Sequence, residues 1–485
     1  MDNLVEGREY VLLSVRFDGS LGRAVLTLLD PVEQKIVTIP GDEDHKPYLL
    51  TDLSEKEVLN IAAIRGHKSF VGVVSVYKRD VLRDRDVKLT KVMAKDPLSI
   101  GRGPRSFREI IKSIGGHVWE GDIKYHNCYI YDKLLIPGYY YVYENGRLKR
   151  KKWVDKSGVR EKIFSLVNPE FEEAKVILDE LIPLFQTPSP QIKMLALDIE
   201  VSSLQEDVIP NVRETEEPII AVALASNDGM KKVLIFDMWG KGEVESEEYE
   251  VEIFKDEREL IKRVCEEIRK YPFVLTFNGD NFDIPYLKHR AQKLGLIEES
   301  KMFRLAEDMA TIECSVHIDL YKFFHNKSIQ TYVFGGKYRE TTLNGVAKAI
   351  LNMEKVSIEK SISELSNKEL ADYCFRDSEL TLKLATFNNY LLIKLMFLFM
   401  RISKLTCYDV TRFGISTWIK NFLYYEFRRR NFLIPTKEEI RKLKGEAVSE
   451  AKIKGKKYLG AIVLNPKPGV HFNVAVLDFS SLYPS

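Results

Sequence analysis

The side chains best suited to chemistry in this 485-residue chain are carboxylates, beginning with Asp198 and Glu200 in LALDIEVSS, residues 195–203. Apolar residues 194–197 lead into this pair, which predicts a buried strand that ends in two carboxylates. Strand side chains alternate, so both would point to the same face of the sheet. Two like charges repel there unless a cation lies between them, and hard divalent cations such as Mg²⁺ bind carboxylate oxygens. Alone, the pair is also explained as solvated carboxylates.

A second carboxylate stretch, FVLTFNGDNFDIPY, begins at residue 273. After its predicted strand, Asn278 and Gly279 make a turn, and Asp283 falls where a helix begins, with Pro285 in the first turn. A carboxylate at this point lies above the carboxyl end of the sheet, where open α/β sheets bind ligands. Ordinary turn and helix-capping chemistry explains the stretch equally well when it is taken alone.

A third stretch, LADYCFRDSELTLKLA at residues 370–385, is strongly helical and places Tyr373 and Asp377 one turn apart on one face. Alone this spacing is common on helices without any function. Taken together, the three stretches supply four carboxylates and one phenol. Such a set would hold two metal ions about 4 Å apart for in-line phosphodiester hydrolysis, with the phenol positioning the attacking water.

The elements around these residues follow a recognisable order. QTPSPQ, residues 186–191, is the clearest linker, because its prolines continue neither a helix nor a sheet interior. After it we expect a three-strand antiparallel meander, then a helix at residues 256–270 and the strand FVLTF. This strand-strand-strand-helix-strand order is that of a ribonuclease H-like nuclease core.

Residues 1–187 read as a mixed, β-rich region. Asn145-Gly146 predicts a type I′ hairpin, one arm of which carries Arg150 and Lys151 beside aromatic residues. Cations interleaved with aromatics can hold a phosphate backbone and stack a base. Lysines that protect an edge strand from aggregation explain the same pattern.

Composition limits the class of protein. With 45% hydrophobic and 11% aromatic residues, the chain can build the cores of about three domains, and its net charge of +2 confines any nucleic-acid surface to local patches. The five cysteines form no CxxC pair, which favours a reducing compartment without a zinc site. The first residues lack an apolar signal region, and the apolar run at 390–400 is too short to span a membrane. We therefore expect a cytoplasmic protein with no membrane partner.

The three stretches resemble the motifs of DEDDy 3′→5′ exonucleases, specifically the proofreading domain of family B DNA polymerases of the archaeal type. DIE, NGDNFD and YxxxD carry the resemblance, together with HIDLYKFF from His317. It implies two Mg²⁺ or Mn²⁺ ions per active site, held by Asp198, Glu200, Asp283 and Asp377. It also implies that Tyr373 orients water and that Asn278 contacts DNA.

The resemblance continues toward the end of the chain. The helical run at 395–435 is similar to the segment that leads to the polymerase palm, where Arg428, Arg429 and Arg430 could face DNA or form a solvated helix end. KKYLGAIVLNPKPG resembles the YxGG loop that contacts the template, with Tyr458 and Gly460 matching it and Ala461 departing from it. The implied domains are 1–187, completed by 390–435, then 188–389 for the exonuclease and 436–485 for the start of the palm.

The last residues, VAVLDFSSLYPS, look like motif A of the polymerase site. The resemblance implies that Asp478 binds both catalytic metal ions. It also implies that the triphosphate is bound by the segment Phe479, Ser480, Ser481, Leu482 and Tyr483. The ring of Tyr483 would exclude a ribose 2′-hydroxyl. The finger helix, the second acidic motif and the thumb that the family needs are not found, so we expect an incomplete palm.

The expected fold is thus an α+β and α/β multidomain protein. One functional reading is a portion of a replicative DNA polymerase, associated with the nucleoid. Its partners would be a DNA primer-template, dNTP, a sliding clamp and a C-terminal polymerase half. The alternative is a free-standing 3′→5′ exonuclease or DNA-binding subunit with a vestigial palm. The sequence also leaves open whether the chain is a split subunit, the part before an intein or a truncation.

Overall fold

The computed structural model describes residues 4–101, 103–155, 157–167, 172–202, 210–306, 309–356, 360–444 and 474–475. The chain divides into two compact units, residues 1–436 and residues 437–485. The second unit contributes helix α16 (Lys437–Lys444) to the described residues. The predicted loop at Tyr458 and Gly460 and motif A from Asp478 to Tyr483 lie outside them.

The first unit begins with a five-stranded sheet in the order β3-β2-β1-β8-β9. Its strands are β1 (Glu9–Asp18), β2 (Arg23–Asp30), β3 (Lys35–Pro40), β8 (Tyr140–Glu144) and β9 (Arg147–Arg150). The predicted hairpin joins β8 to β9, and Asn145 and Gly146 both have positive φ, 51° and 74°, as a type I′ turn requires.

A second sheet follows the order β5-β6-β4-β7. Its strands are β4 (Tyr48–Thr51), β5 (Phe70–Asp80), β6 (Arg85–Ala94) and β7 (Val118–Trp119). The helices of this N-terminal region are α1 (Glu55–Asn60), α2 (Ala62–Arg65), α3 (Pro97–Gly101), α4 (Phe107–Ser113), α5 (Tyr125–Asp132), α6 (Val159–Ser165) and α7 (Glu172–Gln186). Helix α1 starts at a Ser54–Glu57 capping box and ends at Ile61, whose extended backbone angles separate it from α2.

A six-stranded sheet, in the order β13-β12-β11-β10-β14-β17, positions the candidate site. Its strands are β10 (Met194–Val201), β11 (Ile219–Ser226), β12 (Lys231–Phe236), β13 (Glu250–Phe254), β14 (Phe273–Thr276) and β17 (Val316–Asp319). The antiparallel meander β10-β11-β12 and the parallel neighbour β14 confirm the predicted ribonuclease H-like order. Strand β13 was not predicted.

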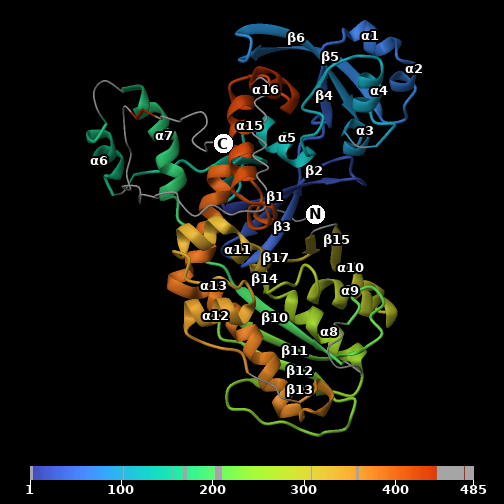
Figure 1. Ribbon diagram of the computed structural model, residues 1–485, viewed down its shortest axis with the longest axis vertical. Coiled ribbons are helices and arrows are strands. Elements are labelled where there is room, and N and C mark those ends of the chain that lie inside the picture. Colours follow the sequence, from blue (N-terminus) through green and yellow to red (C-terminus); the bar gives the residue numbers. More distant parts are fainter. Residues whose placement is uncertain are drawn as a thin grey trace, which may run out of the picture. The chain divides into compact units, whose positions relative to one another are not determined.

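Helices cover both faces of this sheet (Figure 1). Odd-numbered residues of β10, such as Leu195 and Leu197, share a core with α8 (Glu257–Ile268) and α9 (Asp283–Lys293). Even-numbered Met194 and Ala196 pack with α13 (Asn367–Ser403) and α12 (Leu343–Leu351). Residues 198 and 200 therefore face α13, because strand side chains alternate.

Smaller elements connect these layers. They are α10 (Ile297–Lys301), β15 (Phe303–Ala306), β16 (Met309–Ile312), α11 (Leu320–His325), the π-helical turn η2 (Ile329–Val333) and the 3₁₀ turn η3 (Ile362–Glu364). After α13 come α14 (Cys407–Arg412) and α15 (Ile415–Arg429).

Helix α13 consists of two helical parts that are separated by a break in the backbone. Phe387, Asn388, Asn389 and Tyr390 have non-helical backbone angles and separate a first part, which covers the sheet, from a second part. By length and composition alone α13 could cross a membrane. The break interrupts such a span, and Met396 and Phe397 of the second part are buried in the core with β1 residues, so a core helix accounts for the apolar run.

The arginines near the end of α15 do not form a simple solvated helix end. Arg428 is buried, donates to Glu120 at 2.6 Å and also contacts Asp132 and Tyr48. Arg429 pairs with Glu180 at 2.8 Å, and Arg430 pairs with Glu426 at 3.1 Å. Arg428 therefore ties α15 to the N-terminal region, and its guanidinium is not presented to DNA.

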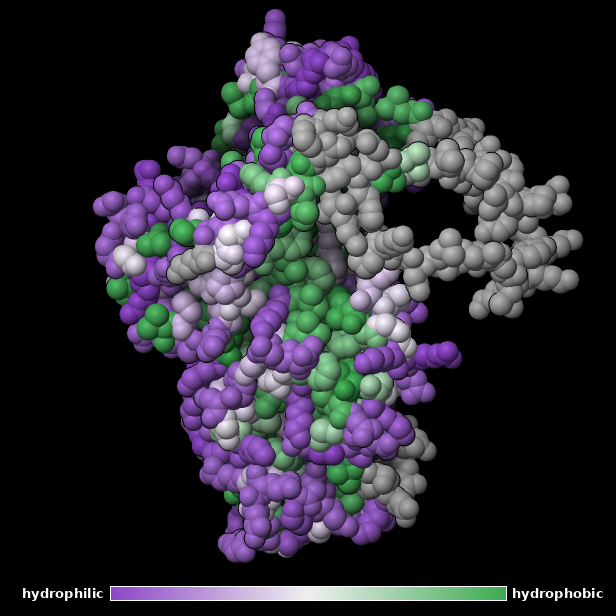
Figure 2. Space-filling view, turned by 90° about the vertical axis from the view of Figure 1, so that its left-hand side faces the viewer, coloured by the Kyte–Doolittle hydropathy of each residue, from purple (hydrophilic) through white to green (hydrophobic). Residues whose placement is uncertain are grey.

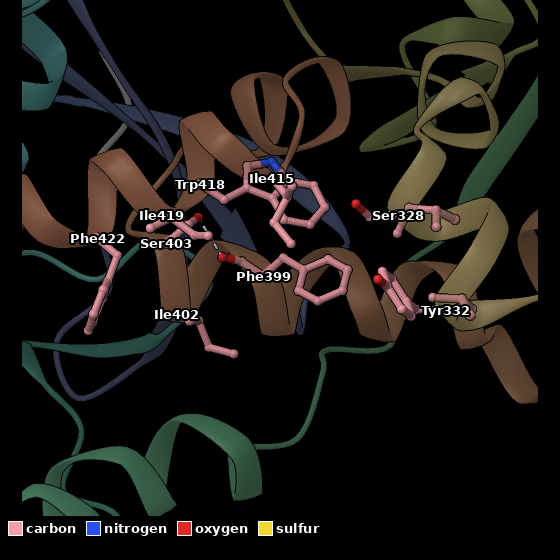
Figure 3. A pocket seen from close by; sticks show the side chains of 11 residues that line it. Ser328, Tyr332, Phe399, Ile402, Ser403, Ile415, Trp418, Ile419 and Phe422 are labelled. Carbon is pink, nitrogen blue, oxygen red and sulfur yellow. Dashed lines mark hydrogen bonds between the residues drawn. The ribbon is translucent and has the colours of Figure 1, made fainter. Parts of the chain in front are cut away.

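Hydrophobic side chains gather in a strip on the face shown in Figure 2. An apolar pocket of about 340 Å³ lies between η2, α13 and α15, where Phe399 and Trp418 stack with ring centroids 4.7 Å apart (Figure 3). Its lining includes the exposed side chains Tyr332, Ile415 and Ile419 but no carboxylate, cysteine or histidine. The pocket therefore lacks the groups that hydrolytic or metal chemistry needs.

Candidate active site

The carboxyl end of strand β10 carries the first two carboxylates. Asp198 and Glu200 lie at half-buried positions between the buried Leu197, Ile199 and Val201. Apolar packing on the α8 side fixes the strand, which leaves the two acids pointing toward α13. The structure thus places both acids on one face of the sheet, as strand alternation predicts.

The loop between β14 and α9 brings in the third carboxylate. Asn278 adopts a left-handed backbone conformation, φ 73°, and Asp283 is the first residue of α9. The buried carboxylate of Asp283 accepts a hydrogen bond from the backbone nitrogen of Ile199 at 3.2 Å. Because Ile199 lies between Asp198 and Glu200, this bond holds Asp283 beside both.

Helix α13 supplies the fourth carboxylate and the phenol. Its capping box, Ser366 with Glu369, fixes the helix start, and Asp377 is buried where α13 crosses the sheet. Lys355 donates to Oδ2 of Asp377, and its ammonium lies 5.8 Å from the ring centroid of Tyr373. Lys355 was not predicted as a site residue.

The electrostatics show that the four acids influence one another as one cluster. Burial, then the charge of Asp377, raises the pKa of Asp198 well above its usual range and that of Glu200 to about 8. Burial raises the pKa of Asp283 to about 7. Burial also raises the pKa of Asp377, although Lys355 opposes the shift. Like charges gathered in a poorly solvated place cost free energy that a cation would offset.

The donor set fits divalent metal ions. Candidate ligand atoms of Asp198, Glu200 and Cys374 lie within 4.8 Å of one another. The buried Oδ1 of Asp377 has no hydrogen-bond partner in the part of the chain that the structure describes. An orphaned carboxylate oxygen beside three further acids is what a site for hard, oxygen-preferring cations such as Mg²⁺ requires.

Cys374 is a neighbour of the cluster that the sequence did not single out. Its thiol lies 3.6 Å from the backbone oxygen of Asp198 and 3.9 Å from Oδ2 of the same residue. Burial, then the charge of Asp198, raises the pKa of this thiol well above its usual range. A protonated thiol is only a weak hydrogen-bond donor, and Mg²⁺ prefers oxygen ligands, so we expect the carboxylates rather than Cys374 to bind such an ion.

Of the predicted DNA contacts, Asn278 lies in the loop before Asp283, whereas Arg150 and Lys151 lie at the end of β9 in the N-terminal region. The backbone nitrogen of Asn278 donates to Asp319 at 2.8 Å, and its side-chain oxygen accepts from Asn281 at 2.7 Å. Arg150 is exposed on β9, whereas the exposed Lys151 pairs with Glu9 at 2.5 Å. A DNA role for Asn278, Arg150 and Lys151 stays a prediction.

The six-stranded sheet has a ribonuclease H-like order, and the acidic cluster at the carboxyl end of β10 is typical of metal-dependent nucleases. Comparison with known families agrees with this. The family model described as "DNA polymerase family B, exonuclease domain" matches residues 116–333, and the model "DNA polymerase family B" matches residues 405–485. Tyr373 and Asp377 lie outside the first matched segment, but helix α13 places them beside the acids of that segment.

Individual relatives extend the similarity along the chain. DNA polymerase 1 of Saccharolobus solfataricus is 42% identical over 100% of this chain and 54% of its own length. DNA polymerase 1 of Aeropyrum pernix is 39% identical over 99% of this chain and 50% of its own length. A solved family B DNA polymerase from Pyrobaculum calidifontis, 19% identical, has the same fold with a TM-score of 0.64 over 95% of this chain and 54% of that one.

The chain therefore belongs to DNA polymerase family B. It spans about half the length of the curated relatives that it matches. The predicted family is confirmed, and so is the predicted multidomain mixed fold.

Proposed function

We propose that the described domain is a 3′→5′ exonuclease that removes nucleotides from a DNA 3′ end, within a portion of a replicative DNA-directed DNA polymerase. The observation that carries the proposal is the convergence of Asp198, Glu200, Asp283 and Asp377 from one strand and two helices. Four acids with raised pKa values and one orphaned oxygen suit two Mg²⁺ or Mn²⁺ ions.

The carboxylates, Tyr373 and Lys355 have different roles in the proposed hydrolysis. The four carboxylates would hold the ions, which when bound supply Lewis-acid stabilisation of the phosphodiester oxygens and an activated water. A tyrosine phenol carries its proton at neutral pH, and burial, then the charge of Glu200, raises the pKa of Tyr373 further, so its hydroxyl can donate a hydrogen bond that orients the attacking water. Lys355 neutralises part of the charge of Asp377.

The whole-protein part of the proposal rests on the sequence. Asp478 would bind metal in a polymerase site, and residues 479–483 would hold dNTP, with a C-terminal half completing the site. Primer-template DNA is the proposed substrate, with contacts at Asn278, Arg150, Lys151, Tyr458 and Gly460. A sliding clamp is a proposed partner, and the cytoplasm is the proposed location. The proposed domains are 1–187 completed by 390–435, then 188–389, and finally 436–485. Nucleotide incorporation on adding a purified C-terminal half would test this part.

The exonuclease is tested by digestion of 3′-labelled DNA with Mg²⁺. We expect single-stranded ends to be removed faster than paired ends, because the scissile phosphate must reach a recessed cluster. The Asp198→Ala/Glu200→Ala double variant should lose the activity, and Arg428→Lys, remote from the acids, should keep it. Digestion at the wild-type rate by the double variant would overturn the assignment.

A further inference from the structure

A buried carboxylate that the proposed reaction does not use lies beside the site. Asp280 sits in the loop between β14 and α9, three residues before Asp283, and its side chain is fully buried. The guanidinium of Arg412 makes a bidentate interaction with the Asp280 carboxylate: Nε donates to Oδ2 at 2.8 Å and Nη2 donates to Oδ1 at 2.9 Å. Such paired, charge-assisted bonds fix orientation as well as position.

Further groups complete the surroundings of Asp280. Lys322 Nζ lies 3.1 Å from Oδ2, His317 Nδ1 lies 3.4 Å from Oδ1, and the backbone nitrogen of Ala310 donates to Oδ1 at 2.8 Å. Burial alone would raise the pKa of Asp280, but His317 and Arg412 outweigh it and hold the pKa well below its usual range. In this ion pair Asp280 is therefore negatively charged and Arg412 is positively charged.

The same loop is held from its backbone side. Asp319, at the end of β17, accepts hydrogen bonds from the backbone nitrogens of Asn278 at 2.8 Å and Asp280 at 3.1 Å. Asp319 therefore binds the loop through its backbone, and Arg412 binds it through the side chain of Asp280. Asp283 comes directly after the loop, and its carboxylate meets β10 through Ile199.

Arg412 comes from a different part of the chain. It is the last residue of α14, 132 residues after Asp280, and lies in the segment that matches the polymerase model. The loop lies in the segment that matches the exonuclease model. The guanidinium is itself oriented, since Nη1 donates to the backbone oxygen of Tyr408 at 3.2 Å and to Oγ1 of Thr411 at 3.3 Å.

We propose that Arg412 is a positioning residue of the exonuclease, acting through Asp280 to fix the loop and so the place of Asp283 among the other carboxylates. Arg412 touches neither substrate nor reacting atoms. The inference rests on the proposed function, in which Asp283 is a metal ligand. Misplacement of a reacting group by about 1 Å can cost about 10²-fold in rate, so a loosened loop should show in the kinetics.

A purely structural role for Arg412 is the competing explanation, and the chain offers a matched control for it. Arg428 is also a buried arginine after residue 405, and it pairs with Glu120 at 2.6 Å. Its contacts to Glu120, Asp132 and Tyr48 lie in the N-terminal region. Arg412→Lys and Arg428→Lys each keep the charge and remove a forked guanidinium, so both should lower the melting temperature.

The test uses the full 485-residue chain. For each variant we would measure kcat and KM on a single-stranded oligonucleotide with Mg²⁺, and hydrogen exchange at the backbone amides of Asn278 and Asp280. We expect Arg412→Lys to lower kcat about 10- to 100-fold with KM within about twofold, and to speed exchange at both amides. Arg428→Lys should do neither. Wild-type kcat in Arg412→Lys, or an equal fall in Arg428→Lys, would overturn the proposal.

Two further results separate the possible failures. If Arg412 acts through Asp280, Asp280→Asn combined with Arg412→Lys should be no slower than the slower single variant, and multiplied losses would count against the route through Asp280. If the wild-type chain digests no DNA, the proposed function fails. The exchange experiment then still decides the positioning: faster exchange in Arg412→Lys upholds it, and unchanged exchange overturns it.

Discussion

At the scale of single residues, Tyr373 is the site's phenol among carboxylates. Its phenol is protonated at neutral pH, as in any tyrosine with an ordinary or raised pKa, so it can donate a hydrogen bond. Tyr373→Phe should lower the rate of exonucleolytic hydrolysis about 10²-fold and leave the affinity for Mn²⁺ unchanged, because a water-orienting group does not bind the ion. Calorimetric Mn²⁺ titration beside the rate measurement checks both, and a large loss of affinity would show a ligand role instead.

Of the site residues predicted from local patterns, the structure brings the carboxylates of Asp198, Glu200, Asp283 and Asp377 together. Asp198 and Glu200 follow from strand alternation, and Asp283 follows from a turn and helix start within ten residues of a strand. Lys355 and Arg412 were not predicted, because each meets its partner 22 or 132 residues away and no local pattern marks it. Arg428 was left open for the same reason: its burial depends on Glu120.

At the scale of elements, the turn between β14 and α9 depends on Gly279. A Cβ there would lie 2.2 Å from Oγ1 of Thr276, which cannot swing away without losing its hydrogen bond to His317 at 2.8 Å. Gly279→Ala should therefore lower the free energy of unfolding by about 1–3 kcal/mol and reduce exonuclease activity about tenfold or more. Thermal unfolding and digestion rates measure the two effects.

Gly72→Ala is the control for that substitution. A Cβ at Gly72, in β5, meets no described atom within 4 Å, so stability and digestion should stay near those of the wild type. A Gly279→Ala variant as active and as stable as Gly72→Ala would contradict the tight packing of the turn.

The elements that sequence reasoning missed have physical causes. Strand β13 reads EVEIF, and its glutamates look like loop residues, yet as an edge strand it pairs with β12 while Glu252 meets Lys232 and Arg263. The break in α13 falls at Asn388 and Asn389, which adopt left-handed angles more readily than most residues. The meander and α8 were predicted because their apolar periodicity is strong.

At the scale of the whole molecule, the acidic cluster links stability to pH. The folded chain holds protons on Glu200 up to about pH 8 and on Asp283 up to about pH 7, whereas the unfolded chain releases them near their ordinary pKa values. As pH rises from about 4 to about 8, the unfolded state is favoured and this contribution to stability is lost. A bound cation offsets the loss.

We therefore expect Mg²⁺ to raise the melting temperature more at pH 8 than at pH 6, because at pH 6 protons on Glu200 and Asp283 compete with the ion. Thermal unfolding with and without Mg²⁺ at both pH values measures this. The Asp198→Ala/Glu200→Ala variant should lose most of the difference. Equal shifts at both pH values in the wild type would contradict the titration of these acids.

The proposed activity requires that four carboxylates from β10, α9 and α13 bind a pair of divalent ions. Anomalous diffraction from crystals of the chain grown with Mn²⁺ tests it most directly. We expect two peaks about 4 Å apart, coordinated by Asp198, Glu200, Asp283 and Asp377. A map with no peak within coordination distance of Asp198 and Asp283, or unchanged peaks in the Asp198→Ala/Glu200→Ala variant, would contradict it.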